Sequence, residues 1–239
     1  MRGSLKSPPV SHGDPIHLRP TAALAERVLL PGDPGRALAL AQALMREPLM
    51  FNHHRGLWGY TGTAQDGEPL TIQATGMGGP SAVIVLEELI ALGARRAVRV
   101  GTCGGLAPGL ALGELIVARE AICADGTSRA LGGDERVQAD PTITAALMGA
   151  APAARAGTVV SVDLFYEPDG HGAGHSALAV EMEAAALFAV GALRGVPVGC
   201  VLTVSDTFGD GEERRRIDDE ALLSAAESMG EAAIAALAV

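Results

Sequence analysis

The stretch LTIQATGMGGPSAVIVLEELIALGARRAVRVGTCGG, residues 70–105, decides the fold class. A short apolar run ends in glycines, an apolar segment with a proline in its first turn follows, and a second apolar run ends at Gly101. Short apolar runs that alternate with helical segments are typical of α/β domains. In such domains ligands bind at the carboxyl ends of the strands. The residues that follow each run are therefore the candidate site residues.

The same alternation continues along the chain, with glycine and proline at the boundaries. The predicted strands are 27–30, 57–63, 70–75, 97–101, 114–119, 157–162 and 198–205. The predicted helices are 35–44, 81–92, 141–148, 182–194 and one within 217–238. Neither a repeat nor a linker-like change of composition divides the chain. We therefore expect a single domain over 16–239, preceded by a poorly ordered extension over 1–15.

The composition excludes several classes of protein. Apolar residues make up 48% of the chain, which is enough for a large core, whereas aromatic residues make up only 3%. The 18 basic and 28 acidic residues give a net charge of −10, which argues against nucleic acid or an anionic membrane as a partner. Three distant cysteines and scattered histidines predict neither disulfides nor a metal site. Because no segment reads as a signal peptide or membrane span, we expect a cytoplasmic protein.

Two arginines lie where a small anion could bind. Arg36 ends the turn 31–36 after the first predicted strand, where free backbone N–H groups and a guanidinium could hold an anion, or where the arginine could simply lie at the surface. Arg99 lies inside an apolar strand, so it requires either a buried acidic partner or a bound anion. Thr102 adds a hydroxyl at the end of that strand. The run 76–81 is not a dinucleotide fingerprint, because Ser81 takes the place of its third glycine.

Three carboxylates also stand next to predicted elements. Glu181 and Glu183 precede an alanine-rich helix, where they could stabilise its N-terminus or accept hydrogen bonds from a vicinal diol. Asp206 ends an apolar strand, and partial burial would raise its pKa and make it a proton donor near neutral pH. The alternative for Asp206 is an ordinary turn or cap aspartate. The mixed-charge run 212–220 is most simply a solvated face.

Taken together and in this order, segments of the chain resemble the nucleoside phosphorylases of the hexameric bacterial type, which act on purine nucleosides or uridine. These segments are PGDPGRA (31–37), HRGLWGYTGT (54–63), GMGGPSAVIVLEEL (76–89), VRVGTCGG (98–105), SVDLFY (161–166), VEMEAAALF (180–188) and TVSD (203–206). The resemblance implies a three-layer α/β/α fold with a central mixed, partly barrel-like sheet. It also implies a homohexamer, a trimer of dimers, whose active sites are shared between subunits.

The resemblance further implies how phosphate and ribose are bound. The residues that would hold phosphate are Gly32, Arg36, Arg99 and Thr102. Arg55 would reach into the phosphate site of the neighbouring subunit, and His17 would contact the 5′-hydroxyl across the same interface. Met182 and Glu183 match the ribose-binding pair, with Glu183 on the 2′ and 3′ hydroxyls.

For the base, the resemblance implies that Phe165 packs against the ring beside the Val180–Glu181 segment, and that Ser205 also belongs to this part of the site. Asp206, when protonated, would donate to N7 of a purine. Relatives that act on purines place an arginine after this aspartate to assist the proton donation. Arg216 is the candidate for that role.

The expected activity is reversible phosphorolysis of purine ribo- or deoxyribonucleosides to free base and sugar 1-phosphate in nucleoside salvage, by a pentosyltransferase that needs phosphate as co-substrate and no cofactor. Uridine phosphorolysis is the alternative, but a pyrimidine offers no atom equivalent to N7. The Gln-x-Arg pair typical of uridine phosphorylases after Phe-Tyr is also absent from 167–171. A nucleosidase that uses water would not need Arg36 and Arg99. A nucleoside-binding protein without turnover is a further alternative, because the segment 167–180 looks shorter than is usual.

Overall fold

The computed structural model describes residues 15–166, 176–208 and 214–238. All but one residue of the expected N-terminal extension, and most of the segment 167–180, lie outside the described residues. No helix in the described part of the chain is long and apolar enough to cross a membrane.

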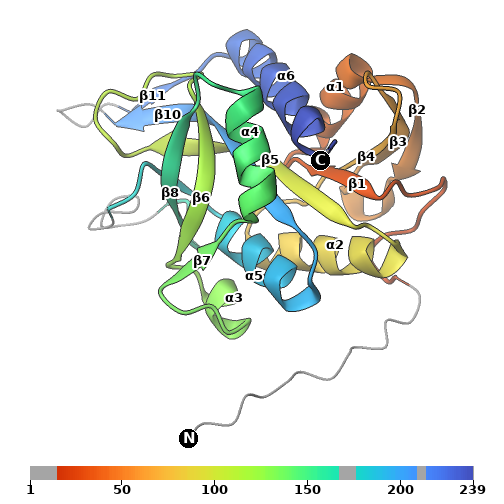
Figure 1. The fold of residues 1–239 in the computed structure, drawn as a ribbon, viewed down its shortest axis with the longest axis horizontal. Coiled ribbons are helices and arrows are strands. Elements are labelled where there is room, and N and C mark those ends of the chain that lie inside the picture. The colour runs from red at the N-terminus through yellow and green to blue at the C-terminus, as the bar shows by residue number, and fades with distance from the viewer. Residues whose placement is uncertain (1–14, 167–175, 209–213, 239) are drawn as a thin grey trace, which may run out of the picture.

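The described residues form one large sheet with helices on both of its faces (Figure 1). The strands are β1 (Arg27–Leu30), β2 (Met45–Asn52), β3 (Gly59–Ala64), β4 (Pro69–Gln73), β5 (Arg96–Gly105), β6 (Leu115–Cys123), β7 (Arg136–Gln138), β8 (Arg155–Ser161), β9 (Ala179–Glu181), β10 (Val198–Phe208) and β11 (Arg214–Arg216). The helices are α1 (Pro34–Leu44), η1 (His54–Gly56), α2 (Gly79–Leu92), α3 (Gly126–Ala130), α4 (Pro141–Ala150), α5 (Ala184–Arg194) and α6 (Asp219–Ala236).

The sheet is partly closed into a barrel. Its strands follow the order β11-β10-β6-β8-β9-β5-β1-β4-β3-β2, and β10 also pairs with β5. The strands β5, β10, β6, β8 and β9 therefore form a closed ring, from which β1, β4, β3 and β2 continue as an open extension. Parallel pairs, such as β1–β5 and β5–β10, occur beside antiparallel pairs, such as β6–β10 and β3–β4. The prediction of a mixed, partly barrel-like sheet is confirmed.

The helices form two outer layers (Figure 1). Helices α1, α4 and α6 cover one face of the sheet, where Leu44 and Met229 belong to a single buried cluster. Helices α2, α3 and α5 cover the other face, where Leu86 and Phe188 belong to a second buried cluster. Because each helix buries one apolar side against the sheet, the two cores lie on opposite faces and produce three layers.

The predicted strands and helices are all present, with boundaries that differ by a few residues. The strand β2 was not predicted, because it lacks a regular alternation of apolar and polar residues. It contains Pro48, Glu47 has a positive φ of 46°, and its pairing with β3 is irregular at two places. Four other short elements were not predicted either. The strands β7, β9 and β11 have three residues each, and the helix α3 has five, so none is long enough to show a periodic pattern.

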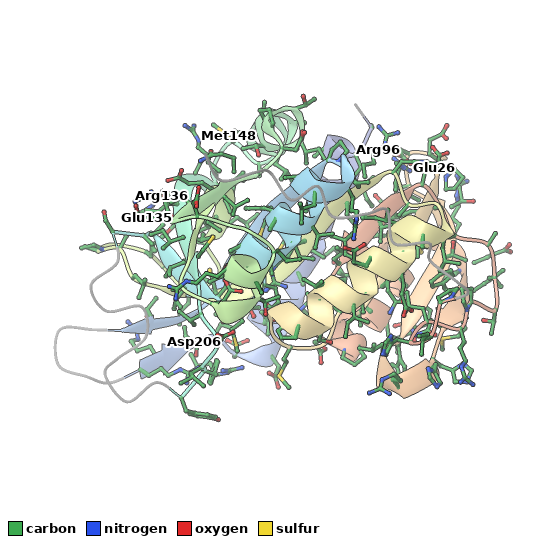
Figure 2. The ribbon with its side chains drawn as sticks, turned by 90° about the horizontal axis from the view of Figure 1, so that it is seen from below. Glu26, Arg96, Glu135, Arg136, Met148 and Asp206 are labelled. Atoms are coloured by element: carbon green, nitrogen blue, oxygen red, sulfur yellow. The ribbon has the colours of Figure 1, made fainter. Side chains whose placement is uncertain are left out.

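The parallel strands β1, β5 and β10 bring their carboxyl ends to the same edge of the sheet. Figure 2 shows Glu26 and Arg96, at the amino ends of β1 and β5, on the opposite side of the molecule from Asp206 near the end of β10. The pairing of β10 with β5 shifts register between Val204 and Asp206. Such a bulge changes the direction of side chains at the end of a strand. Ser205 and Asp206 lie beside the end of β5, where Asp206 pairs with Gly104 and the Ser205 hydroxyl donates to the carbonyl of Cys103.

Candidate active site

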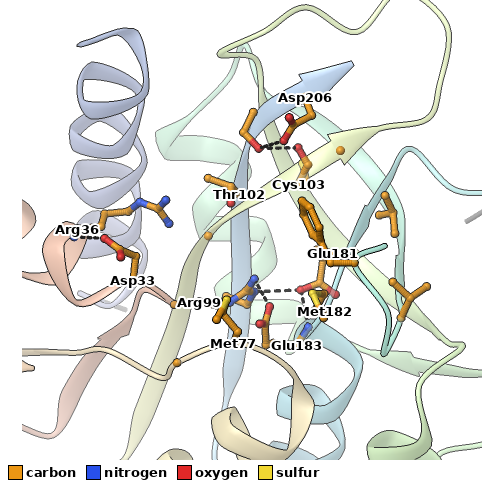
Figure 3. A pocket seen from close by; sticks show the side chains of 18 of the residues that line it. Asp33, Arg36, Met77, Arg99, Thr102, Cys103, Glu181, Met182, Glu183 and Asp206 are labelled. Atoms are coloured by element: carbon orange, nitrogen blue, oxygen red, sulfur yellow. Dashed lines mark hydrogen bonds and ion pairs between the residues drawn. The ribbon is translucent and has the colours of Figure 1, made fainter. Parts of the chain in front are cut away.

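A pocket of about 350 Å³ opens at this edge of the sheet (Figure 3). It is formed by the loops that follow β1 and β4 and by the ends of β5, β9 and β10. The predicted site residues that line it are Gly32, Arg36, Arg99, Thr102, Phe165, Val180, Glu181, Met182, Glu183, Ser205 and Asp206. His17, Arg55 and Arg216 do not line it. Segments far apart in the sequence thus meet in one cavity.

Arg99 lies at the centre of this pocket and is only 4% exposed. Its Nε donates to Glu181 Oε2 at 3.1 Å, and its Nη2 forms an ion pair with Glu183 Oε2 at 2.5 Å. Burial alone would lower the pKa of Arg99, but these two carboxylates raise it above its ordinary value. Its Nη1 is buried and has no hydrogen-bond partner among the described residues. Arg99 therefore has the acidic partners that its burial requires and still has a donor for an anion.

A glycine makes room for this arginine. The guanidinium of Arg99 folds over Gly101, where an added Cβ would lie 2.8 Å from the Cζ atom of Arg99. Since real Cβ atoms essentially never come so close to another heavy atom, any larger residue at position 101 would displace the guanidinium. The close contact with Arg99 thus explains why a glycine, Gly101, ends the predicted strand 97–101.

Glu181 is engaged within the fold. Besides Arg99, its carboxylate accepts hydrogen bonds from the Ser161 hydroxyl and from the backbone N–H groups of Glu183 and Ala184 at the start of α5. A carboxylate at this place satisfies N–H groups that have no partner within the helix. The carboxylate of Glu181 therefore connects Arg99, the end of β8 and the N-terminus of α5. Glu181 also lines the pocket.

Glu183 has a different surrounding. Its Oε1 accepts the N–H of Gly78 at 2.6 Å, and its Oε2 forms the ion pair with Arg99. Gly78 has a φ of 84°, a conformation that favours glycine, and it caps the N-terminus of α2. Each carboxylate oxygen thus has one internal partner and keeps a further lone pair. Both Glu183 and Met182 line the pocket and lie close to Arg99 in Figure 3.

Arg36 approaches the pocket from α1. Asp33 caps this helix by accepting the backbone N–H of Arg36 at 2.6 Å, so the arginine lies in the first turn. Burial lowers the pKa of Arg36, as does the positive charge of Arg99, whereas Asp33 raises it. Within the described ranges the guanidinium of Arg36 makes no hydrogen bond. Figure 3 shows Arg36, Arg99 and Thr102 around the same part of the cavity. Two positive charges and a hydroxyl here suit one small anion.

Asp206 lies near the other end of the cavity, and its expected raised pKa is wrong for this structure. Burial alone would raise the pKa of Asp206, but the hydrogen bonds from Arg214 and Ser205 and the nearby charges of Arg214 and Arg216 hold it below its ordinary value. Arg214 Nε lies 2.8 Å from Asp206 Oδ1, and the Ser205 hydroxyl lies 2.8 Å from Oδ2. In this arrangement the ionised form of Asp206 is favoured.

Arg214 is a site residue that the sequence did not identify. It lines the pocket, and its Cζ lies 4.8 Å from the centre of the Phe165 ring. The candidate chosen from the sequence, Arg216, reaches Asp206 only at 3.4 Å, and its side chain is 63% exposed. Residues two apart on a strand share a face, so Arg214 and Arg216 both point towards Asp206. Arg214, Arg215 and Arg216 are exposed, as a solvated face requires, but Arg214 also lines the pocket and pairs with Asp206.

His17 and Arg55 lie outside the pocket of their own subunit. His17 is half-buried, and its Nδ1 donates to Glu88 Oε1 at 2.7 Å. Arg55 is exposed in the short helix η1 and has a positive φ of 59°. Its side chain makes no hydrogen bond within the part of the chain that the structure describes.

The described residues provide neither a metal-binding cluster nor a reactive thiol. They contain no group of three or more His, Cys, Asp or Glu side chains that could hold a metal ion. All three cysteines are free and buried. Burial raises the pKa of the Cys103 and Cys200 thiols, so neither is a reactive thiolate.

The fold agrees with comparisons to known proteins. Residues 26–239 match the model of the phosphorylase superfamily, and the chain belongs to this family. It is 40% identical over 203 residues to the purine nucleoside phosphorylase DeoD-type of Geobacillus kaustophilus, a match that covers 81% of this chain and 86% of that protein. It is also 38% identical over 213 residues to the purine nucleoside phosphorylase DeoD-type of Clostridium beijerinckii, covering 82% and 88% of the two chains. The predicted resemblance is confirmed.

Proposed function

We propose that this chain catalyses the reversible phosphorolysis of purine ribo- and deoxyribonucleosides to free base and sugar 1-phosphate. The relatives described above carry the name of that activity. The observation that carries the proposal is the buried Nη1 of Arg99, which has no partner among the described residues although it lies in a pocket beside Arg36. A buried donor of this kind requires an acceptor, and phosphate supplies one.

Phosphate is the nucleophile in this proposal. One of its oxygens attacks C1′ as the bond from C1′ to the base breaks, so the sugar carries positive charge in the transition state. Arg36, Arg99 and Thr102 hold the phosphate, together with the backbone at Gly32. Fixing the anion below C1′ removes the entropic cost of bringing the two reactants together. No metal or cofactor takes part in these steps.

Glu183 and Met182 hold the sugar on the other side of the anion. The free lone pairs of the Glu183 carboxylate accept hydrogen bonds from the 2′ and 3′ hydroxyls. Because Glu183 is tied to Arg99 and to the Gly78 N–H, its position is fixed before the substrate binds. A preorganised carboxylate near the sugar also stabilises the positive charge that develops on it.

The departing purine takes a proton at N7, and Asp206 is the donor. The base packs against Phe165, with Val180, Glu181 and Ser205 around it, and covers Asp206. Desolvation is already the largest single influence on the pKa of Asp206, and a bound base increases it, which favours the protonated form. Arg214, and not Arg216, is the arginine placed to act with Asp206. Uridine has no equivalent of N7, so it is the less favoured substrate.

We also propose that the active protein is a homo-oligomer, a hexamer built as a trimer of dimers, in the cytoplasm. Residues 16–239 form its single domain, and His17 and Arg55 complete the site of a neighbouring subunit. Large apolar side chains are exposed in the same part of the chain, namely Ile16, Leu49, Met50 and Trp58. Such exposed apolar groups are typical of surfaces that bind another protein.

A substrate panel tests the proposal. Inosine, adenosine and uridine are incubated with the purified protein, with and without inorganic phosphate, and release of the base is measured. We expect purine release only when phosphate is present, and little release of uracil. Base release that does not depend on phosphate would contradict the proposal, and a nucleoside that binds without being converted would show a binding protein instead.

A further inference from the structure

The carboxylate of Glu88, on α2, holds the N-terminal segment 16–18 in place. It accepts the backbone N–H groups of these residues, at 3.1 Å from Ile16, 3.0 and 3.1 Å from His17 and 2.7 Å from Leu18. It also accepts the Nδ1 of His17 at 2.7 Å. Burial would raise the pKa of Glu88, but these hydrogen bonds lower it below its ordinary value. One ionised carboxylate thus fixes both the backbone and the ring of His17.

Asn52, at the end of β2, makes a second set of contacts around the same segment. Its side chain is buried, and its Oδ1 accepts the N–H of Arg19 at 2.9 Å. Its Nδ2 donates to the carbonyl of Leu57 at 2.5 Å, beyond the helix η1 that carries Arg55. The two amide ends of one buried side chain therefore connect the N-terminal segment to the turn around Arg55.

A direct contact completes this connection. His54 Nδ1 donates to the backbone carbonyl of His17 at 2.9 Å. Arg55 follows in the left-handed conformation, which residues other than glycine rarely adopt and which persists where the surroundings enforce it. These polar contacts fix the ring of His17 and the backbone at Arg55, two residues that do not line the pocket of their own subunit.

We infer that Asn52 and Glu88 are positioning residues that hold His17 and Arg55 as one preassembled unit for the site of a neighbouring subunit. The inference rests on the proposed function, which places the 5′-hydroxyl contact of His17 and the phosphate contact of Arg55 in that site. Neither Asn52 nor Glu88 touches substrate. Without Glu88, the backbone N–H groups of the N-terminal segment lose their shared acceptor, and His17 loses its fixed ring orientation.

Kinetics separate this role from a general structural one. Glu88→Gln keeps the shape of the side chain but replaces one acceptor oxygen with an N–H₂ that faces other donors. We expect the KM for inosine to rise roughly tenfold, as for the loss of one charged hydrogen bond. Glu87→Gln is the matched control, because Glu87 is the preceding residue on α2 and pairs with Arg194 of α5 at 2.9 Å. The control should leave the KM for inosine unchanged.

A double-mutant cycle tests whether Glu88 acts through His17. If it does, Glu88→Gln added to His17→Ala raises the KM for inosine no further than His17→Ala alone, because the positioned side chain is already gone. Independent, additive effects of the two changes would overturn the inference. Glu88→Asp retains the carboxylate, and we expect it to recover part of the loss.

Mixed oligomers test whether the unit acts in the neighbouring site. Asp206→Asn disables a subunit's own site, and Glu88→Gln weakens the unit that the subunit presents to its neighbour. When the two variants are co-expressed, a pair that contains one of each has one site with neither defect. Under random pairing, and at inosine concentrations well below the wild-type KM, where Glu88→Gln alone retains only about a tenth of the activity, we expect about one quarter of the wild-type rate.

A different activity is expected if Glu88 acts only within its own subunit. If Glu88 supports only its own subunit, no site in the mixture is free of defects, and the activity equals the average of the two variants measured alone. That result would overturn the inference while leaving the proposed function intact. Absence of phosphorolysis in the unmodified protein would instead refute the proposed function itself.

Discussion

The substitution Arg99→Lys is a sharp test of the phosphate site, because it keeps the positive charge but removes the planar guanidinium with its donors in three fixed directions. Arg99 serves Glu181 with Nε, Glu183 with Nη2 and leaves Nη1 for an anion. A lysine ammonium is a single point with rotatable donors, and it cannot serve three acceptors in different directions. It will stay with the two buried carboxylates, whose charges would otherwise be unpaired. The bound phosphate therefore loses one charged hydrogen bond.

The expected size of this effect follows from the energy of one such bond. A hydrogen bond to a charged group contributes about 1.5–3 kcal/mol, which corresponds to a roughly 10- to 150-fold higher KM for phosphate. Initial rates with inosine at varied phosphate concentrations measure it. The KM for inosine should change much less, because the sugar and base contacts are made by other residues.

Arg27→Lys is the matched control. Arg27 is 5% exposed and donates to both carboxylate oxygens of Asp66, at 2.6 and 3.0 Å, but it does not line the pocket. The same substitution there should lower thermal stability and leave the KM for phosphate unchanged. An unchanged KM for phosphate in Arg99→Lys, or an equal increase in both variants, would refute the reasoning.

Three further predictions concern the end of the pocket where the base binds and the space around Arg99. Asp206→Asn should lower kcat for inosine by about 10²- to 10⁴-fold without changing the KM for phosphate, because it removes a proton donor and no phosphate contact; steady-state kinetics measure both, and an equal effect on both would contradict the role. Arg214→Gln should reduce purine cleavage more than Arg216→Gln, and it should raise the pKa of Asp206, since Arg214 makes the shorter contact with its charged form. The pH profile of kcat/KM then shifts to higher pH for Arg214→Gln, and a shift to lower pH would show that the pairing is misassigned. Gly101→Ala should raise the KM for phosphate, because the new Cβ would displace Arg99, and phosphate kinetics with an unaltered KM would show that the guanidinium can move freely.

Much of the site could be predicted from the sequence, because the carboxyl ends of parallel strands meet at one edge. The strands 27–30, 97–101 and 198–205 were all predicted from their apolar runs, although β5 and β10 continue to Gly105 and Phe208. Arg99 was recognisable as a buried charge in such a run. The family resemblance then supplied the order in which these pieces contact phosphate, sugar and base.

What could not be predicted depends on partners far away in the sequence. The sequence left open whether Arg99 has an acidic partner or binds an anion. The structure shows two acidic partners, Glu181 and Glu183, and one guanidinium nitrogen without a partner among the described residues. These partners lie about 80 residues further along the chain, so the sequence around Arg99 does not reveal them. The pKa of Asp206 depends on which arginine of β11 lies against it. That strand has only three residues, and its register with β10 leaves no periodic signal in the sequence.

The most direct test of the central claim is to incubate inosine and inorganic phosphate with the purified protein and to follow the phosphates by phosphorus NMR and the purine species by proton NMR. The account predicts that the phosphate signal decreases while a sugar 1-phosphate signal and free hypoxanthine increase in equal amounts, and that the reaction stops when phosphate is omitted. Release of hypoxanthine with free ribose and an unchanged phosphate signal would contradict it.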